Sequence, residues 1–97
     1  MSIFDLTGRT AVITGGNGGI GLGIAQALNA QGCNVSIWGR NAEKNKNAAA
    51  TMSAGPGKVQ TLVCDVSDPA SVKAAMKATL DHFGRVDGCF ANAGQIC

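Results

Sequence analysis

Hydrophobic and polar positions along the chain follow two alternating patterns, which predict strands and helices in turn. Short apolar runs rich in β-branched residues are typical of buried strands, and they occupy residues 9–14, 33–38, 58–64 and 86–91. Helical spacing predicts helices from Ile20 to a stop at Gly32, from a cap at Asn41 to about Ser53, and from Ser67-Asp68-Pro69 to Gly84. The predicted order of elements is therefore βαβαβαβ.

The last of these helices has the clearest start and the clearest apolar face. Asp68 is a capping residue, and Pro69 suits the first helical position. Between Val72 and Phe83, apolar and small side chains recur at helical spacing along one face. The second predicted helix is mostly Ala, Lys and Asn, so its apolar stripe is thin.

Strands that are separated by helices of this length lie parallel and are joined by right-handed crossovers. This order predicts an open α/β sheet, doubly wound, with helices on both faces. The 97 residues allow one small domain, and no linker, repeat or low-complexity segment divides them.

Composition and charge exclude several classes of protein. With 45% hydrophobic and 14% charged residues, the chain is expected to be globular. Its net charge of +2 comes from scattered Lys and Arg residues, which argues against a nucleic acid partner. No apolar run is long enough for a transmembrane helix, and residues 1–10 do not resemble a signal peptide. We therefore expect a cytoplasmic protein with no membrane partner.

The cysteines and the single histidine do not form a metal-binding motif. Cys33, Cys64, Cys89 and Cys97 contain no C-x-x-C pair, and His82 has no ligand at metal spacing. Two disulfides are possible in a secreted chain, but without a signal peptide we expect reduced cysteines that pack as small hydrophobic residues.

The first connection between a strand and a helix is unusually rich in glycine. Residues 14–21 read TGGNGGIG, and six of the nine positions from Gly15 to Gly23 are glycine. A helix N-terminus attracts phosphate, and a turn of nearly bare backbone lets a dinucleotide pyrophosphate approach closely. The alternative is a glycine turn with a purely structural role. No Lys-Ser/Thr pair follows the turn, which excludes a P-loop.

Three motifs in order resemble the classical short-chain dehydrogenase/reductase family. Thr14, Gly15, Gly19 and Gly21 match its TGxxxGxG pattern, and Asp65 matches the aspartate after its third strand. Asn92-Ala93-Gly94 resembles the end of its NNAG element, with Ala91 in place of the first Asn.

This resemblance implies a set of residues that bind a dinucleotide. Gly15, Gly19 and Gly21 would hold the pyrophosphate, lined by the backbone of Asn17 and Ile20; Asp65 and the Val66 backbone would bind adenine; Asn92 and Gly94 would lie beside the ribose. Two alternatives remain open from turn propensity: Asp65 can cap a turn before Ser67-Asp68, and Asn92 can be a strand-end turn residue. The expected unit is a partial Rossmann-like domain over residues 1–97 with strand order 3-2-1-4.

The end of the second strand bears on the choice of cofactor. An NAD site places a carboxylate there to hold the ribose 2′-OH, but this position is Gly39, followed by Arg40. An arginine can bind a 2′-phosphate through charge-assisted hydrogen bonds, so NADP(H) is favoured and NAD(H) stays possible. The alternative is that Arg40 is a solvated loop residue.

The family's catalytic residues are not in this chain. The resemblance implies a Tyr that exchanges the proton, with a Lys, a Ser and an Asn, in the second half of the family's fold. The chain has no tyrosine. His82 is expected to be a solvated residue near a helix end, and Cys97 has no base beside it, so no catalytic residue is assigned.

Two hypotheses follow for the function. In the first, the chain is the cofactor-binding portion of a longer oxidoreductase that transfers hydride between NADP(H) and an alcohol or carbonyl substrate. In the second, it is a complete non-catalytic nucleotide-binding or interaction module. In a truncated domain the fourth strand is expected to present an open apolar edge where further strands normally pair, which favours self-association or a homo-oligomer.

Overall fold

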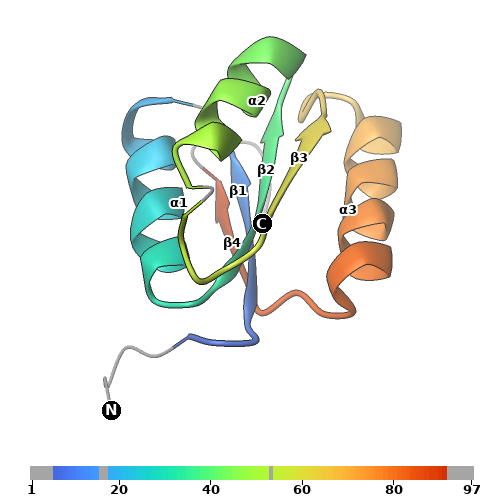
Figure 1. Cartoon of the computed structure of the whole chain (residues 1–97). Coiled ribbons are helices and arrows are strands. Elements are labelled where there is room, and N and C mark those ends of the chain that lie inside the picture. The colour runs from blue at the N-terminus through green and yellow to red at the C-terminus, as the bar shows by residue number, and fades with distance from the viewer. Residues whose placement is uncertain (1–5, 16–17, 53, 92–97) are drawn as a thin grey trace.

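The computed structural model describes residues 6–15, 18–52 and 54–91 (Figure 1). Its elements are β1 (Thr10–Thr14), α1 (Gly19–Ala30), β2 (Asn34–Gly39), α2 (Ala42–Ala50), β3 (Val59–Val63), α3 (Pro69–Phe83) and β4 (Gly88–Ala91). The predicted order βαβαβαβ is confirmed. The largest differences are that α2 ends at Ala50 and that β4 begins at Gly88, two residues after the predicted start at Val86.

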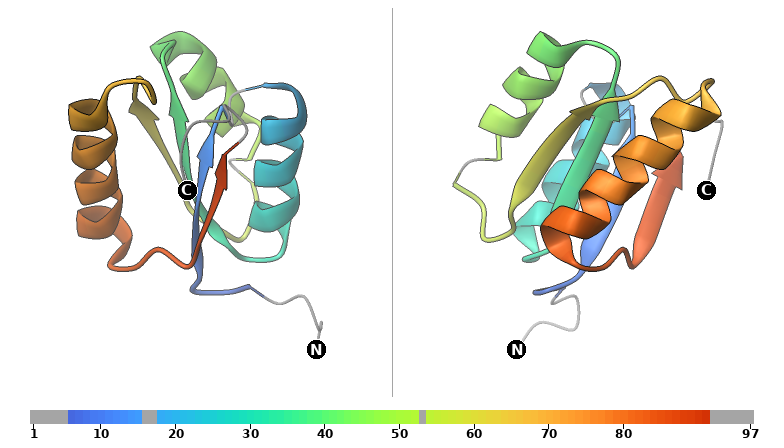
Figure 2. Two further views of the ribbon diagram at one scale, coloured as in Figure 1. Left: turned by 180° about the vertical axis from the view of Figure 1, so that it is seen from behind. Right: turned by 90° about the vertical axis from the view of Figure 1, so that its right-hand side faces the viewer.

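The four strands form one parallel sheet in the order β3-β2-β1-β4, as the sequence predicts. Helices α1 and α2 cover one face of the sheet and α3 covers the other (Figure 2). Strand residues alternate between two hydrophobic cores: Ile13 and Ile37 belong to the core that Ala25 of α1 and Ala48 of α2 complete, and Val12 belongs to the core on the α3 side. The fold is therefore an open, doubly wound, Rossmann-like sheet.

Local chemistry sets the helix ends much as the sequence suggests. Asp68 caps α3, its Oδ1 accepting a hydrogen bond from Ala70 N at 3.1 Å, and Gly84 ends the helix with a φ of +80°. Asn41 caps α2 by accepting from Lys44 N at 2.9 Å. The thin stripe of α2 is nonetheless a real contact surface, because Asn45 and Ala48 are both buried.

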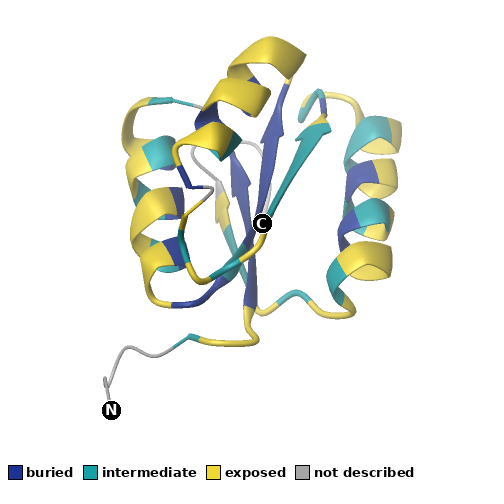
Figure 3. Ribbon diagram, viewed as in Figure 1, coloured by how far each residue is buried: buried dark blue, intermediate teal, exposed yellow. Residues whose placement is uncertain are grey.

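Burial is concentrated in the two central strands. Every residue of β1 is buried, whereas β3 is half-buried along most of its length (Figure 3). On β4, Phe90 is 40% exposed, and Leu80 of α3 is 43% exposed. Within the described residues β4 pairs with β1 alone, so the expected apolar edge is open there, and the α3 face of the sheet is only partly covered.

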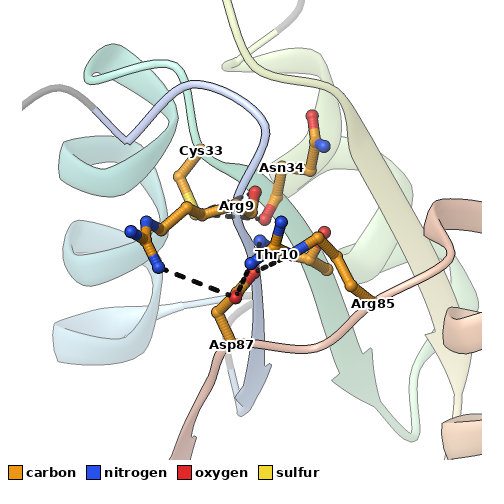
Figure 4. A network of polar contacts seen from close by, with 6 residues as sticks. All are labelled: Arg9, Thr10, Cys33, Asn34, Arg85 and Asp87. Carbon is orange, nitrogen blue, oxygen red and sulfur yellow. Dashed lines mark hydrogen bonds and ion pairs between the residues drawn. The ribbon is translucent and has the colours of Figure 1, made fainter.

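A polar network ties the start of β4 to the start of β1 (Figure 4). Thr10 N donates to Asp87 Oδ2 at 2.8 Å, and Asp87 N donates to Thr10 O at 2.7 Å. Arg85 Nε donates to the same carboxylate at 2.8 Å, and Arg9 lies 3.8 Å from it. These contacts hold residue 87 before the strand ladder begins, which explains why β4 starts at Gly88.

The described cysteines differ from one another. Cys33 and Cys64 are buried free thiols, as expected. Burial raises the pKa of the Cys33 thiol, and the nearby Asp87 carboxylate raises it further. Cys89 is disulfide-bonded, so the expectation of reduced cysteines is wrong at this position, because an apolar strand environment does not by itself prevent a thiol from being paired.

The described residues contain neither a membrane-spanning helix nor a metal-binding cluster. None of the helices in residues 6–15, 18–52 and 54–91 is long and apolar enough to cross a membrane. In the same part of the chain, no group of His, Cys, Asp and Glu side chains is placed to hold a metal ion.

Candidate functional site

The predicted site residues that the structure describes gather at one end of the sheet. All strands are parallel, so their carboxyl ends share this edge, and α1, α2 and α3 all begin there (Figure 1). In doubly wound sheets, ligands bind at the carboxyl ends of the strands, where the chain changes direction between strands 1 and 4.

The glycine turn connects the end of β1 to the first turn of α1. Gly15 N donates to Trp38 O at 2.9 Å, so the turn begins hydrogen-bonded to β2. Gly15 and Gly19 have φ values of +68° and +58°, in the left-handed region that favours glycine. Gly18 caps α1 without a side-chain hydrogen bond. Gly18 itself has no side chain that could cover the first N–H groups of α1, which suits an anion.

The neighbouring residues of the turn differ in exposure. Gly21 is buried in α1, whereas the side chain of Ile20 projects outward and is 78% exposed. Asn17 lies outside the described residues.

Asp65 follows β3 and is held in a turn of its own. Its Oδ1 accepts hydrogen bonds from Ser67 N at 3.0 Å and Ser67 Oγ at 2.6 Å, and its own N–H donates to Ser71 Oγ at 3.0 Å. These Ser67 bonds lower the pKa of the Asp65 carboxyl below its usual value. The turn-capping alternative is therefore realised, through one carboxylate oxygen. Val66, partly buried, packs against the core on the α3 side.

Arg40 lies next to this turn, at the end of the neighbouring strand. It follows Gly39, which pairs in register with Val63 of β3. The positive charge of Arg40 contributes a smaller share to the lowered pKa of Asp65. Arg40 itself is exposed. The structure thus brings together the glycine turn, Arg40 and Asp65, while Asn92 and Gly94 lie outside the described residues.

Sequence reasoning missed two residues of α2 that border this site. A methyl group built on Gly18 would lie 3.1 Å from Cε and 3.2 Å from Nζ of Lys44, so the lysine amine lies against the glycine turn. Asn45 Nδ2 donates to Gly39 O at 2.9 Å and to Leu62 O at 3.2 Å, joining the ends of β2 and β3. Neither residue has a distinctive sequence signal, because a lysine and an asparagine in a polar helix are typical of a solvated face.

The comparison with protein families agrees with this geometry. The model of the short chain dehydrogenase family matches residues 9–97. This chain belongs to the short-chain dehydrogenase family. Nothing in the comparisons favours the hypothesis of a separate binding module.

Known short-chain dehydrogenases resemble the chain in sequence and in structure. Levodione reductase from Leifsonia aquatica is 42% identical over 90 residues, which cover 91% of this chain and 34% of that protein. The structure of NAD+-bound xylitol dehydrogenase matches with a TM-score of 0.88 at 29% identity, covering 92% of this chain and 34% of that one. The C-domain of a bacterial malonyl-CoA reductase, with NADP, matches with a TM-score of 0.81 at 35% identity, covering 91% of this chain and 15% of that one.

Two facts follow from these matches. The chain spans about a third of the length of the curated short-chain dehydrogenases it matches. The similar structures include both an NAD+ complex and an NADP complex, so the likeness alone does not distinguish the two cofactors.

Proposed function

We propose that residues 1–97 are a partial Rossmann-like, dinucleotide-binding domain of an oxidoreductase that transfers hydride between NADP(H) and an alcohol or carbonyl substrate. The observation that carries the proposal is the glycine turn at the carboxyl end of β1, inside a chain that matches the short-chain dehydrogenase family over residues 9–97. Positive φ values at Gly15 and Gly19 and the glycine N-cap of α1 suit a pyrophosphate.

In this proposal the cofactor lies across the carboxyl ends of the strands. Gly15, Gly19 and Gly21 hold the pyrophosphate, with the backbone of Asn17 and Ile20 beside it. The adenine amino group donates to the Asp65 carboxylate, and the Val66 backbone completes the pocket; Asn92 and Gly94 lie near the ribose. Asp65 supports this role because the bonds from Ser67 occupy Oδ1 and keep the group ionised.

The proposed preference for NADP(H) depends on Gly39 and Arg40. Gly39 offers no carboxylate to the ribose 2′-OH, and Arg40 is exposed at the strand end. No ion pair occupies its guanidinium within the described part of the chain. A hydrogen bond to a charged group is worth about 1.5–3 kcal/mol, which corresponds to roughly a tenfold to hundredfold change in Kd.

The test is Arg40→Ala in the full-length protein that contains this segment, with Kd values for NADPH and NADH from calorimetric titration. We expect the Kd for NADPH to rise about tenfold or more and the Kd for NADH to change little. Equal losses for both cofactors would refute the 2′-phosphate role. A full-length protein that binds neither cofactor would refute the proposed function itself.

Catalysis is assigned to residues beyond this segment. The 97 residues include no tyrosine. His82 is on the last turn of α3, at the opposite end of that helix from the proposed site. Proton transfer at the substrate oxygen therefore requires a group from elsewhere in the longer protein. Oxidation of NADPH by the full-length protein with a panel of ketones and aldehydes, followed by absorbance, tests the reaction class.

The remaining parts of the proposal concern location and assembly. A cytoplasmic location is consistent with the buried free thiols of Cys33 and Cys64, although the paired Cys89 does not support it. Self-association is supported by the exposed edge of β4, where Phe90 remains 40% exposed.

A further inference from the structure

Lys44 reaches the glycine turn from a different helix. It belongs to the first turn of α2, and its Cε and Nζ lie 3.1 Å and 3.2 Å from the position that a Cβ on Gly18 would occupy. Gly18 has an extended backbone with a φ of −173°, so its conformation does not require glycine. The absent side chain instead leaves the space in which the lysine amine lies.

The backbone that carries Lys44 is held by two side chains of the same helix. Asn41 accepts from Lys44 N at 2.9 Å and fixes the start of α2. Asn45 is buried and donates to Gly39 O and Leu62 O, at the ends of β2 and β3. The backbone of Lys44 is therefore held close to the ends of β2 and β3, which Arg40 and Asp65 follow.

Lys44 is also outside the ion pairs of the described residues. Across residues 6–15, 18–52 and 54–91, the ion pairs join Arg9 and Arg85 to Asp87 and Lys77 to Asp81. Neither Lys44 nor Arg40 takes part in one, even though Glu43 is next to Lys44 in the chain. Two exposed cations outside these ion pairs thus lie on the β2–α2 side of the glycine turn, and Arg40 is near enough to the Asp65 carboxylate to lower its pKa.

We propose that Lys44 binds the 2′-phosphate of NADP(H) together with Arg40 and is a second residue that determines cofactor specificity. This inference rests on the proposed function. A phosphate monoester near neutral pH carries more than one negative charge, so it can use two cations. Arginine supplies a planar pair of donors, and lysine supplies a compact point charge.

The position of Lys44 favours the 2′-phosphate over the pyrophosphate. The pyrophosphate in this fold is held by the glycine turn and the N–H groups of α1, whereas the ribose 2′ position faces the end of the second strand. Lys44 comes from the helix that follows this strand and approaches Gly18, the residue just before α1. It therefore lies between the strand end and the turn.

The test compares Lys44→Ala with Lys46→Ala in the full-length protein. Lys46 is an exposed lysine of the same helix, so Lys46→Ala changes the net charge and the helix propensity of α2 by the same amount as Lys44→Ala. Kd values for NADPH and NADH are measured by calorimetric titration at low and at high salt. We expect Lys44→Ala to raise the Kd for NADPH about tenfold and to change the Kd for NADH less than about twofold. Lys46→Ala should leave both constants nearly unchanged, and Lys44→Arg should retain most of the preference.

The outcomes separate this inference from the function on which it rests. If the unaltered protein binds NADPH and Lys44→Ala leaves the Kd for NADPH unchanged, the role of Lys44 is refuted and the proposed dinucleotide site is retained. An equal loss of affinity for NADPH and NADH would mean that Lys44 contacts the pyrophosphate, which both cofactors share, and would also refute its role in specificity. If the unaltered protein binds neither nucleotide, both proposals fail. A smaller effect of Lys44→Ala on NADPH at high salt would support a charge contact, because salt screens exposed charges.

Discussion

Glycines close together in the chain have different physical roles. Gly19, at the start of α1, has a φ of +58°, and no atom lies within 4 Å of a Cβ built on it. Gly23, one helical turn later, also has open space around a built Cβ but has no positive φ. The first glycine is required by backbone conformation and the second is not. The sequence cannot distinguish them, because both belong to the same glycine-rich segment.

This difference predicts opposite effects of the same substitution. Gly19→Ala should lower the free energy of unfolding by about 1–2 kcal/mol, because an alanine in the left-handed region is strained. Gly23→Ala should raise it by about 0.5–1 kcal/mol, because alanine favours a helix interior. Urea denaturation of the full-length protein measures both. Changes of the same sign in the two variants would contradict the conformational argument.

At the scale of elements, the sequence predicts features that depend on neighbouring residues better than features that depend on contacts between distant residues. The start of α3 was correctly predicted because Asp68 and Pro69 carry the capping chemistry within two adjacent positions. The sequence pattern predicts the start of β4 too early, at Val86, because an apolar residue before a strand cannot be told from one within it by pattern alone. The start of the strand is set by Asp87, whose carboxylate accepts a hydrogen bond from Thr10 N, a residue distant in the chain.

The contacts within the candidate site also depend on residues that are distant in the chain, so the sequence does not predict them. The strand ends and the glycine turn of the site are predictable from periodicity and composition, since each depends on neighbouring residues. The bonds from Asn45 to Gly39 and Leu62, and the approach of Lys44 to Gly18, join separate elements. Contacts of this kind follow from packing, which one sequence does not reveal.

The Asp87 network joins β1 and β4 at their amino ends, and it should make the pairing of these strands depend on pH. Hydrogen bonds from Arg85 and from Thr10 N lower the pKa of the Asp87 carboxyl. A carboxyl whose pKa is lower in the folded state stabilises the fold above its unfolded pKa, near 4. This stabilisation is lost as the pH falls from there through the lower folded value.

Asp87→Asn removes this titration and tests the argument. The variant should unfold more readily than the unaltered protein at neutral pH, and the difference should shrink as the pH falls below about 4. Denaturant unfolding at a series of pH values measures both curves. Asp81→Asn is the matched control, because Asp81 pairs with Lys77 at an exposed site on α3. A constant difference across the pH range for Asp87→Asn would contradict the assigned role.

For the whole molecule, the sheet has two edges of different character. The order β3-β2-β1-β4 leaves β3 and β4 outermost. Strand β3 is covered on one face by α2 and on the other by α3, and both helices contact it. Strand β4 contacts β1, and Phe90 on it remains exposed. Among the described residues, the open edge at β4 is therefore the one that an exposed aromatic side chain marks.

The 97-residue chain prepared alone should therefore self-associate through β4. An open strand edge pairs with other chains, and a lysine placed on it opposes that pairing. Phe90→Lys should shift the chain toward monomer in sedimentation velocity at high concentration. Val63→Lys adds the same charge to the outer strand at the opposite edge, where Val63 is 63% exposed. If association runs through β4, only the first variant should dissociate; an equal response from both would reflect added charge alone, and a stable monomer without either substitution would refute the role of the β4 edge.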